Sequence, residues 1–107
     1  MDKINEYLKK HHSERVIKGI KLECPCKRIE CTDGFSISVQ ANKYAYCTPA
    51  ANKAWPYKSV ELGFPNVTDE LIEPYAENHE TTSTIYAYVP VEIVECLFEK
   101  HGGIGNF

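Results

Sequence analysis

Apolar and polar residues alternate most clearly between residues 28 and 40. Two alternating segments, 28–32 and 35–40, flank the dipeptide Asp33-Gly34, and such a dipeptide between alternating segments predicts a β-hairpin. Every second residue from Phe35 to Val39 is apolar, while the residues between them are polar. One face of this predicted sheet should therefore pack inward and the other should meet solvent.

A helical period replaces the alternation from Pro90 to His101. Apolar residues recur there at helical spacing and predict an amphipathic helix with a continuous stripe. The stripe consists of Ile93, Val94, Leu97, Phe98 and His101. Pro90 suits the first helical position and Gly102 suits the left-handed cap. Cys96 lies just off the stripe and is interpreted as a packing residue.

Weaker patterns predict the remaining elements. Asp2 can cap a short helix that carries Ile4, Tyr7 and Leu8 on one face. Residues 14–22 alternate loosely, with a bulge or turn at Gly19. Two further strands are expected at 57–64 and 83–89, and the second has the β-branched and aromatic composition of a central strand. A long loop is expected at 42–56, and a short helix at 69–73, capped by Thr68 and ended by Pro74.

These elements predict an α+β fold, with a small antiparallel sheet of four to five strands and the C-terminal helix packed on one face. The 107 residues suit a single domain, 1–107, in which 1–27 form an N-terminal helix and a variable extension. The charged N-terminus and the lack of a long apolar run lead us to expect a cytoplasmic protein with no membrane contact.

The overall charge argues against one class of partner. The formal net charge is −3, the pI is near 5.8, and lysines are interpreted as spread among the acids. A chain without a positive field is not expected to bind nucleic acid independently of sequence.

Cysteines provide the sharpest chemical hypothesis. Cys24, Cys26, Cys31 and Cys47 follow the pattern C-x-C-x4-C-x15-C, which offers enough thiolates for a tetrahedral zinc site. A single residue between the first two ligands strains such a site. The alternative is that Cys31 and Cys47 are small buried hydrophobes and that Cys24 and Cys26 are exposed, reduced thiols.

No local signature of catalysis is present. The four histidines belong to no H-E-x-x-H or G-x-S-x-G pattern, and the glycines after residue 101 follow a helix instead of leading into one. We therefore expect a protein that is not an enzyme and has no catalytic residues and no cofactor.

Tyrosines suggest a binding surface instead. Tyr44 and Tyr46, and likewise Tyr86 and Tyr88, are two residues apart and would share a face of an extended segment. With Lys58 they form the predicted ligand-binding set, on the side of the sheet away from the C-terminal helix. Such a surface could stack a nucleobase, contact a protein, or bury its rings in the core.

Several stretches resemble a family of small uncharacterised proteins from phages and prophages of gut Firmicutes. The resemblance covers residues 28–104 and rests on CTDGFSISVQA, YCTP, YKSVELGFP, PYAE, IYAYVPVEIVE and EKHGG. The chain departs from this pattern at an insertion around 21–26, and at Ala50, where an arginine commonly follows the proline. The insertion weakens a zinc site common to the family, and Ala50 leaves Lys53 or Lys58 as cations for a ligand.

The resemblance implies a viral accessory protein that inhibits host defence. We expect a homo-oligomer that sequesters a nucleotide immune signal in pockets of aromatic and cationic residues. The alternatives are an inhibitor that binds a host effector, such as a CRISPR nuclease, and a small zinc-stabilised structural module. The surface predicted for the effector contains Glu70, Glu73, Tyr75 and Glu77.

Overall fold

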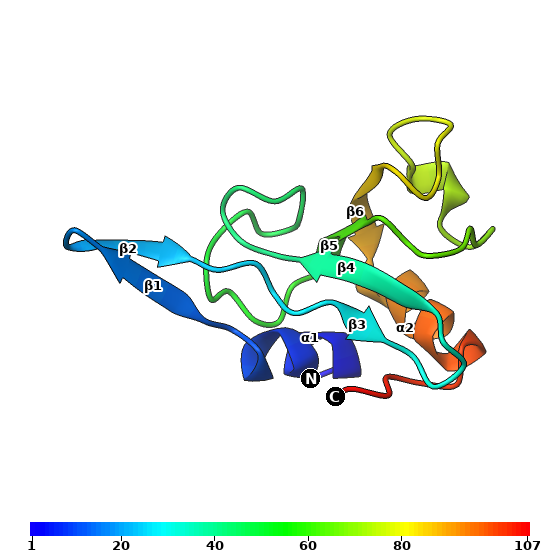
Figure 1. Ribbon diagram of the computed structural model, residues 1–107, viewed down its shortest axis with the longest axis horizontal. Helices are drawn as coiled ribbons and strands as arrows, with labels where there is room; N and C mark the ends of the chain where they lie inside the picture. Colours follow the sequence, from blue (N-terminus) through cyan, green and yellow to red (C-terminus); the bar gives the residue numbers. More distant parts are fainter.

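A four-stranded antiparallel sheet forms the centre of the protein in the computed structural model, which describes residues Met1–Phe107 (Figure 1). Its strands follow the order β3-β4-β5-β6. They are β3 (Ile29–Glu30), β4 (Ser36–Gln40), β5 (Ser59–Gly63) and β6 (Ile85–Pro90). The predicted hairpin is confirmed, with Ile29 opposite Ile37. The predicted α+β class is confirmed as well.

Two α-helices pack against the apolar face of this sheet. They are α1 (Lys3–Lys10) and α2 (Val91–Lys100), and neither is long or apolar enough to cross a membrane. Asp2 caps α1 through the Asn5 N–H, as predicted. In α2 the stripe is confirmed at Val94, Leu97 and Phe98, which are buried. The prediction for Cys96 is wrong, because the helix turns this side chain to solvent.

One apolar core joins the sheet to both helices. Buried residues of α1, among them Ile4 and Tyr7, belong to the same cluster as Val39 of β4 and Val94 of α2. A side chain inside this core ties α1 to the start of β5: Asn5 Oδ1 accepts the Tyr57 N–H (2.6 Å) and Asn5 Nδ2 donates to the Tyr57 carbonyl (3.0 Å). The helix is therefore part of the domain and not an appendage.

Both edges of the main sheet are covered by the chain itself. At β3, the Gly105 N–H donates to the Glu30 carbonyl and the Glu30 N–H donates to Asn106. At β6, Ala76 forms a bridge with Tyr86, and the Tyr88 N–H donates to the Tyr46 carbonyl. The segment 83–89, interpreted as a central strand, therefore forms an edge strand. Because both edges are covered, the main sheet offers no free edge at which a second copy of the chain could add a strand.

A second hairpin, which we call the arm, projects from the body of the protein (Figure 1). It consists of β1 (Glu14–Ile17) and β2 (Ile20–Glu23), so Gly19 marks a turn instead of a bulge within one strand. Lys18 and Gly19 both have positive φ, 51° and 79°, as a two-residue hairpin turn of type I′ requires. The arm accounts for much of the molecule's 42 Å length.

The segment between β5 and β6 differs from the prediction. The helix expected at 69–73 is not formed: residues 70–72 form a turn, and a short 3-10 helix, η1, follows at Glu73–Tyr75. Asp69, and not Thr68, caps the turn, because its carboxylate accepts the Leu71 N–H. Pro74 lies within the first two positions of η1 instead of ending a helix, which agrees with proline's tolerance of a first turn.

Gly102 closes α2 and gives a testable constraint. Its φ is 86°, and an added Cβ would clash with Thr32 Oγ1, whereas Gly103 has a similar φ of 90° and an added Cβ there would meet nothing within 4 Å. We expect Gly103→Ala to cost about 1 kcal/mol of unfolding free energy, from the left-handed backbone alone. Gly102→Ala should cost about 2 kcal/mol, because Thr32 must also move. Urea denaturation of both variants measures the difference, and equal losses would contradict the contact.

Candidate functional site

The sheet face opposite the helices carries three exposed tyrosines. Tyr44 is 80%, Tyr46 47% and Tyr88 52% exposed. Beside them lie side chains of the outward face of β4 and β5, namely Ser38, Gln40 and Glu61, which line an open hollow of about 340 Å³ together with Tyr44. We call Tyr44, Tyr46 and Tyr88 the tyrosine face.

The backbone fixes two of these rings next to each other. The Tyr88 N–H donates to the Tyr46 carbonyl (3.1 Å), and the Tyr46 N–H donates to Glu61 Oε2 (3.0 Å). The ring centroids of Tyr46 and Tyr88 lie 5.9 Å apart with planes at 50°. This spacing is within the range of favourable aromatic pairs. These hydrogen bonds join the long loop 42–56 to strand β6 and hold the backbone segments that carry the two rings.

The prediction that Tyr86 shares a face with Tyr88 is wrong. A register shift between β5 and β6 places Leu62 opposite Tyr86 and Val60 opposite Val89, and Tyr88 has a φ of 52° at this bulge. An extra residue in a strand breaks the two-residue alternation of side chains. Tyr86 is consequently fully buried, and burial raises the pKa of its phenol.

Cations are scarce at the tyrosine face. Lys58 is exposed, and its carbonyl accepts the Val91 N–H where β6 leads into α2. Its ammonium group forms no hydrogen bond or cation–π contact with the tyrosines. Lys43 instead lies over the ring of Tyr44, with Nζ 5.0 Å from the centroid. Glu61 adds a negative charge behind the pair. The surface is thus aromatic and polar, with Lys43 as its cation and with the carboxylates of Glu61 and, at the edge of the hollow, Glu23.

The cysteines do not form a metal centre. No three of Cys24, Cys26, Cys31 and Cys47 bring their sulfur atoms within 4.8 Å of one another. Cys31 and Cys47 are buried, in agreement with their interpretation as small hydrophobes, whereas Cys24 and Cys26 are half-buried and not fully exposed. Burial raises the pKa of the Cys26 and Cys31 thiols to about 11. These sulfurs are therefore protonated at neutral pH and poor nucleophiles.

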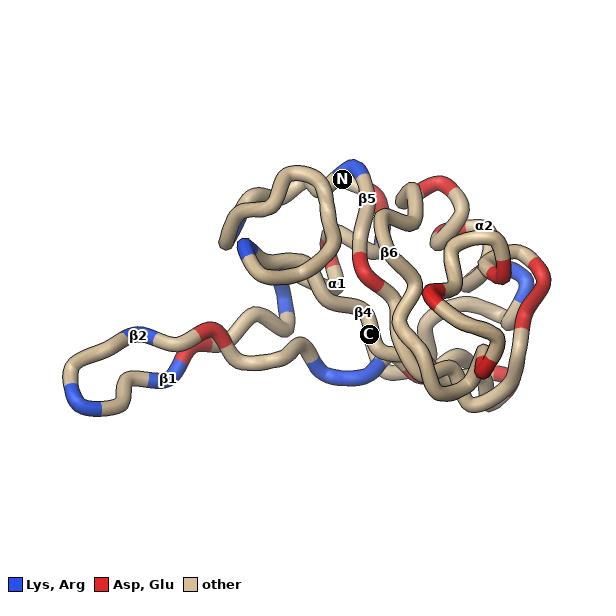
Figure 2. Tube along the Cα trace, turned by 90° about the horizontal axis from the view of Figure 1, so that it is seen from above, with Lys and Arg blue, Asp and Glu red and all other residues tan.

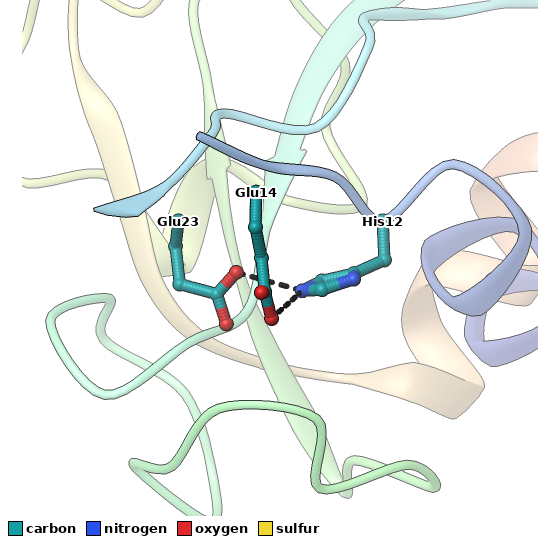
Figure 3. A group of neighbouring side chains, drawn as sticks. All are labelled: His12, Glu14 and Glu23. Atoms are coloured by element: carbon teal, nitrogen blue, oxygen red, sulfur yellow. Dashed lines mark hydrogen bonds and ion pairs between the residues drawn. The ribbon is translucent and has the colours of Figure 1, made fainter. Parts of the chain in front are cut away.

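A cluster that no local sequence pattern indicates lies at the base of the arm and consists of His12, Glu14 and Glu23 (Figure 3). Glu14 lies directly opposite Glu23 in the ribbon, and His12 Nε2 is 2.7 Å from Glu23 Oε2 and 3.8 Å from Glu14 Oε1. An imidazole and two carboxylates are ligand types for a divalent cation. Here Lys53 forms a salt bridge with Glu14 and lowers the pKa of its carboxyl. Lys53 thereby neutralises the Glu14 carboxylate within the chain and ties the arm to the loop 42–56.

A second histidine bridges two carboxylates on the other side of the molecule. His101, after α2, places Nδ1 2.6 Å from Asp33 Oδ2 and Nε2 2.8 Å from Asp69 Oδ2. Its ring stacks on Phe35 at 4.1 Å. Burial opposes a charged ring, but the bonds to Asp33 and Asp69 outweigh it and raise the pKa of His101. We call His101, Asp33 and Asp69 the histidine latch, because it joins three distant segments.

Charge is distributed unevenly, contrary to the interpretation that lysines are spread among the acids. Between Ser59 and Glu99 the sequence has nine carboxylates and no lysine or arginine. Figure 2 shows the consequence, with blue segments along the arm and red segments at the opposite end. Glu70, Glu73 and Glu77 are exposed at this acidic end, and Tyr75 is half-buried beside them. Counting charge by segment, instead of over the whole chain, would have revealed the asymmetry.

Comparison with protein-family models, with curated proteins and with solved structures finds no significant match for this chain.

Proposed function

We propose that the chain is a non-enzymatic binding protein that recognises a partner protein through the tyrosine face. The observation that carries the proposal is the Tyr46–Tyr88 pair, two half-exposed rings whose backbone is fixed by hydrogen bonds on both sides. Preorganised tyrosines lose little conformational entropy on binding and offer both apolar area and a hydroxyl group. Such residues are enriched where protein interfaces concentrate their binding energy.

The shape of the surface supports a macromolecule over a small ligand. The hollow beside Tyr44 is open and lies on a sheet face, whereas small-molecule sites are concave and enclose most of the ligand. A flat face with aromatic rings at its centre and polar groups around them fits a protein surface better.

The resemblance to phage and prophage proteins supports a host defence protein as the first class of partner to test. An inhibitor of this kind blocks an effector, such as a CRISPR nuclease, by occupying one of its surfaces. No chemical step is required of the inhibitor.

Capture of a nucleotide immune signal is a second candidate, favoured by Lys43 above the ring of Tyr44. A base could stack on the tyrosines while the ammonium group meets a phosphate. Glu61 opposes this candidate, because its carboxylate lies within hydrogen-bond distance of the Tyr46 backbone and would repel a phosphate.

The double variant Tyr46→Ser/Tyr88→Ser tests the proposal. Immobilised wild-type protein should retain a host protein from bacterial extract at physiological salt, and the variant should lose at least about 90% of it, since aromatic hot spots contribute 2 kcal/mol or more each. Phe107→Ser is the matched control, because Phe107 is also a partly exposed aromatic residue (36%) but lies against Tyr7 of α1, away from the tyrosine face.

Calorimetry against cyclic nucleotides and cyclic ADP-ribose isomers separates the two candidates. Heat that disappears in the tyrosine variant would favour nucleotide capture. Retention of no protein by the wild type, or equal retention by all variants, would contradict partner recognition through this face.

A further inference from the structure

The arm exposes apolar side chains that the body of the protein does not cover. Val16 is 65%, Ile17 43%, Ile20 62% and Leu22 45% exposed. None of them belongs to the core cluster. A two-stranded ribbon has marginal stability in water by itself, and contiguous exposed apolar residues usually mark a contact surface.

Three of the four exposed apolar residues of the arm, Ile17, Ile20 and Leu22, lie on one face, whereas Val16 lies opposite Lys21 on the other face. Ile17 lies opposite Ile20, and Arg15 lies opposite Leu22, so these four side chains point to the same side of the ribbon. The arm also has two strand edges with no further strand beside them. Arg15, Lys18 and Lys21 give its outer part a positive charge, without any acid between residues 15 and 22.

The acidic end of the same molecule has the complementary character. Glu70, Glu73, Glu77 and Glu80 are exposed and take part in none of the salt bridges. Two exposed apolar side chains lie in the same segment between β5 and β6, Phe64 at 49% and Val67 at 51%. A ligand for this end should therefore be basic and partly apolar, which describes the arm.

We infer that the arm docks on the acidic end of a second copy of this chain, and that two such contacts close a two-fold dimer. Arm and acidic end lie at opposite ends of the long axis (Figures 1 and 2). Two copies placed side by side in opposite directions bring each arm against the other copy's acidic end. Both contacts are then satisfied and no free arm remains, so the assembly closes instead of growing into a fibre.

Sedimentation analysis of the purified full chain tests the dimer. At about 0.05 M salt we expect a particle of twice the chain mass of 12.2 kDa. At about 0.5 M salt the dissociation constant of the dimer should be at least about tenfold higher, because salt screens the exposed charges. A chain that stays monomeric at low salt, up to its highest soluble concentration, would overturn the inference. Binding of the arm to DNA or to another protein would not rescue it.

Charge reversal locates the contact. Arg15→Glu/Lys18→Glu on the arm, where Arg15 shares the apolar face, and Glu73→Lys/Glu77→Lys on the acidic end, should each weaken dimerisation at least about tenfold. Mixed in equal amounts, the two variants should form a heterodimer, because one contact is then wild type and the other has both signs reversed. Failure of the mixture to restore dimers would overturn the arm-to-acid arrangement.

The apolar part and the fold are tested separately. Ile17→Ser/Ile20→Ser should also give monomers, and circular dichroism should show an unchanged body, since the arm is outside the core. The tyrosine variant should dimerise normally, so failure of the dimer and failure of partner recognition through the tyrosine face are distinguishable. A dimer that persists in the arm variants but is lost in the tyrosine variant would contradict the inference.

Discussion

The variant Asn5→Leu is expected to unfold with a free energy about 3–5 kcal/mol lower than that of the wild type. Asn5 is fully buried and satisfies both the N–H and the carbonyl of Tyr57, at 2.6 and 3.0 Å. Leucine has a similar size but can neither donate nor accept. Both backbone groups would then remain buried without partners, and each such group costs about 1–3 kcal/mol.

Urea denaturation monitored by tyrosine and tryptophan fluorescence measures this loss. The control is Asn78→Leu, in an exposed loop, where the side chain accepts only the Glu80 N–H. We expect a change below about 1 kcal/mol in the control. A similarly small change in Asn5→Leu would show that α1 is not anchored by this side chain.

The second large effect is expected at the histidine latch. His101→Ala should lower the free energy of unfolding by about 2–4 kcal/mol, because the Asp69 side chain is only 3% exposed and would lose its bond to the imidazolium. The variant also loses the stacking of the ring on Phe35. His79→Ala is the control, since His79 is exposed and its side chain forms no hydrogen bond or salt bridge, and it should change stability by less than about 0.5 kcal/mol.

The latch also predicts a pH dependence with a defined sign. The pKa of His101 is raised in the folded protein. Its contribution to the free energy of unfolding is therefore complete below about pH 6.5, the ordinary histidine pKa, and is lost as the pH rises through the pKa of the folded state. The carboxyl of Asp33 has a lowered pKa because the Phe35 N–H and His101 donate to it. The pKa of Asp69 is lowered although burial alone would raise it, because bonds from Leu71, His101 and Lys100 outweigh burial.

Asp33 and Asp69 contribute to the free energy of unfolding above about pH 4, and these contributions are lost as the pH falls below that value. The difference in unfolding free energy between wild type and His101→Ala should therefore be larger at pH 6 than at pH 9. An equal difference at both values would mean that the ring is not charged in the folded protein.

Sequence patterns that span only a few residues correctly predicted the first hairpin of the main sheet, the start of α1 and the helix α2. Asp33-Gly34 identified a hairpin, Asp2 identified the start of α1, and the apolar period identified α2, because turn chemistry, capping and amphipathic spacing act within a few residues. The pattern of residues 14–22 left a bulge and a turn at Gly19 as alternatives, because lysine is an unusual residue at the first position of such a turn, where φ is positive.

The candidate site was predicted only in part, for a geometric reason. Tyr44, Tyr46 and Tyr88 reach the surface, but the bulge at Tyr88 turns Tyr86 into the core, and two-residue alternation cannot reveal a bulge. The pairing of Asn5 with Tyr57, and of His101 with Asp33 and Asp69, joins residues far apart in sequence. Such pairs follow from the packing of whole elements and leave no local pattern.

A host protein bound at the tyrosine face should be captured there by photo-crosslinking in host cells. Tyr44→p-benzoylphenylalanine places the reactive group on this face, and Cys96→p-benzoylphenylalanine places it on the exposed side of α2. We predict a covalent adduct with a host protein from position 44 and none from position 96. Adducts from position 96 alone, or from neither position, would contradict the binding of a host protein at the tyrosine face.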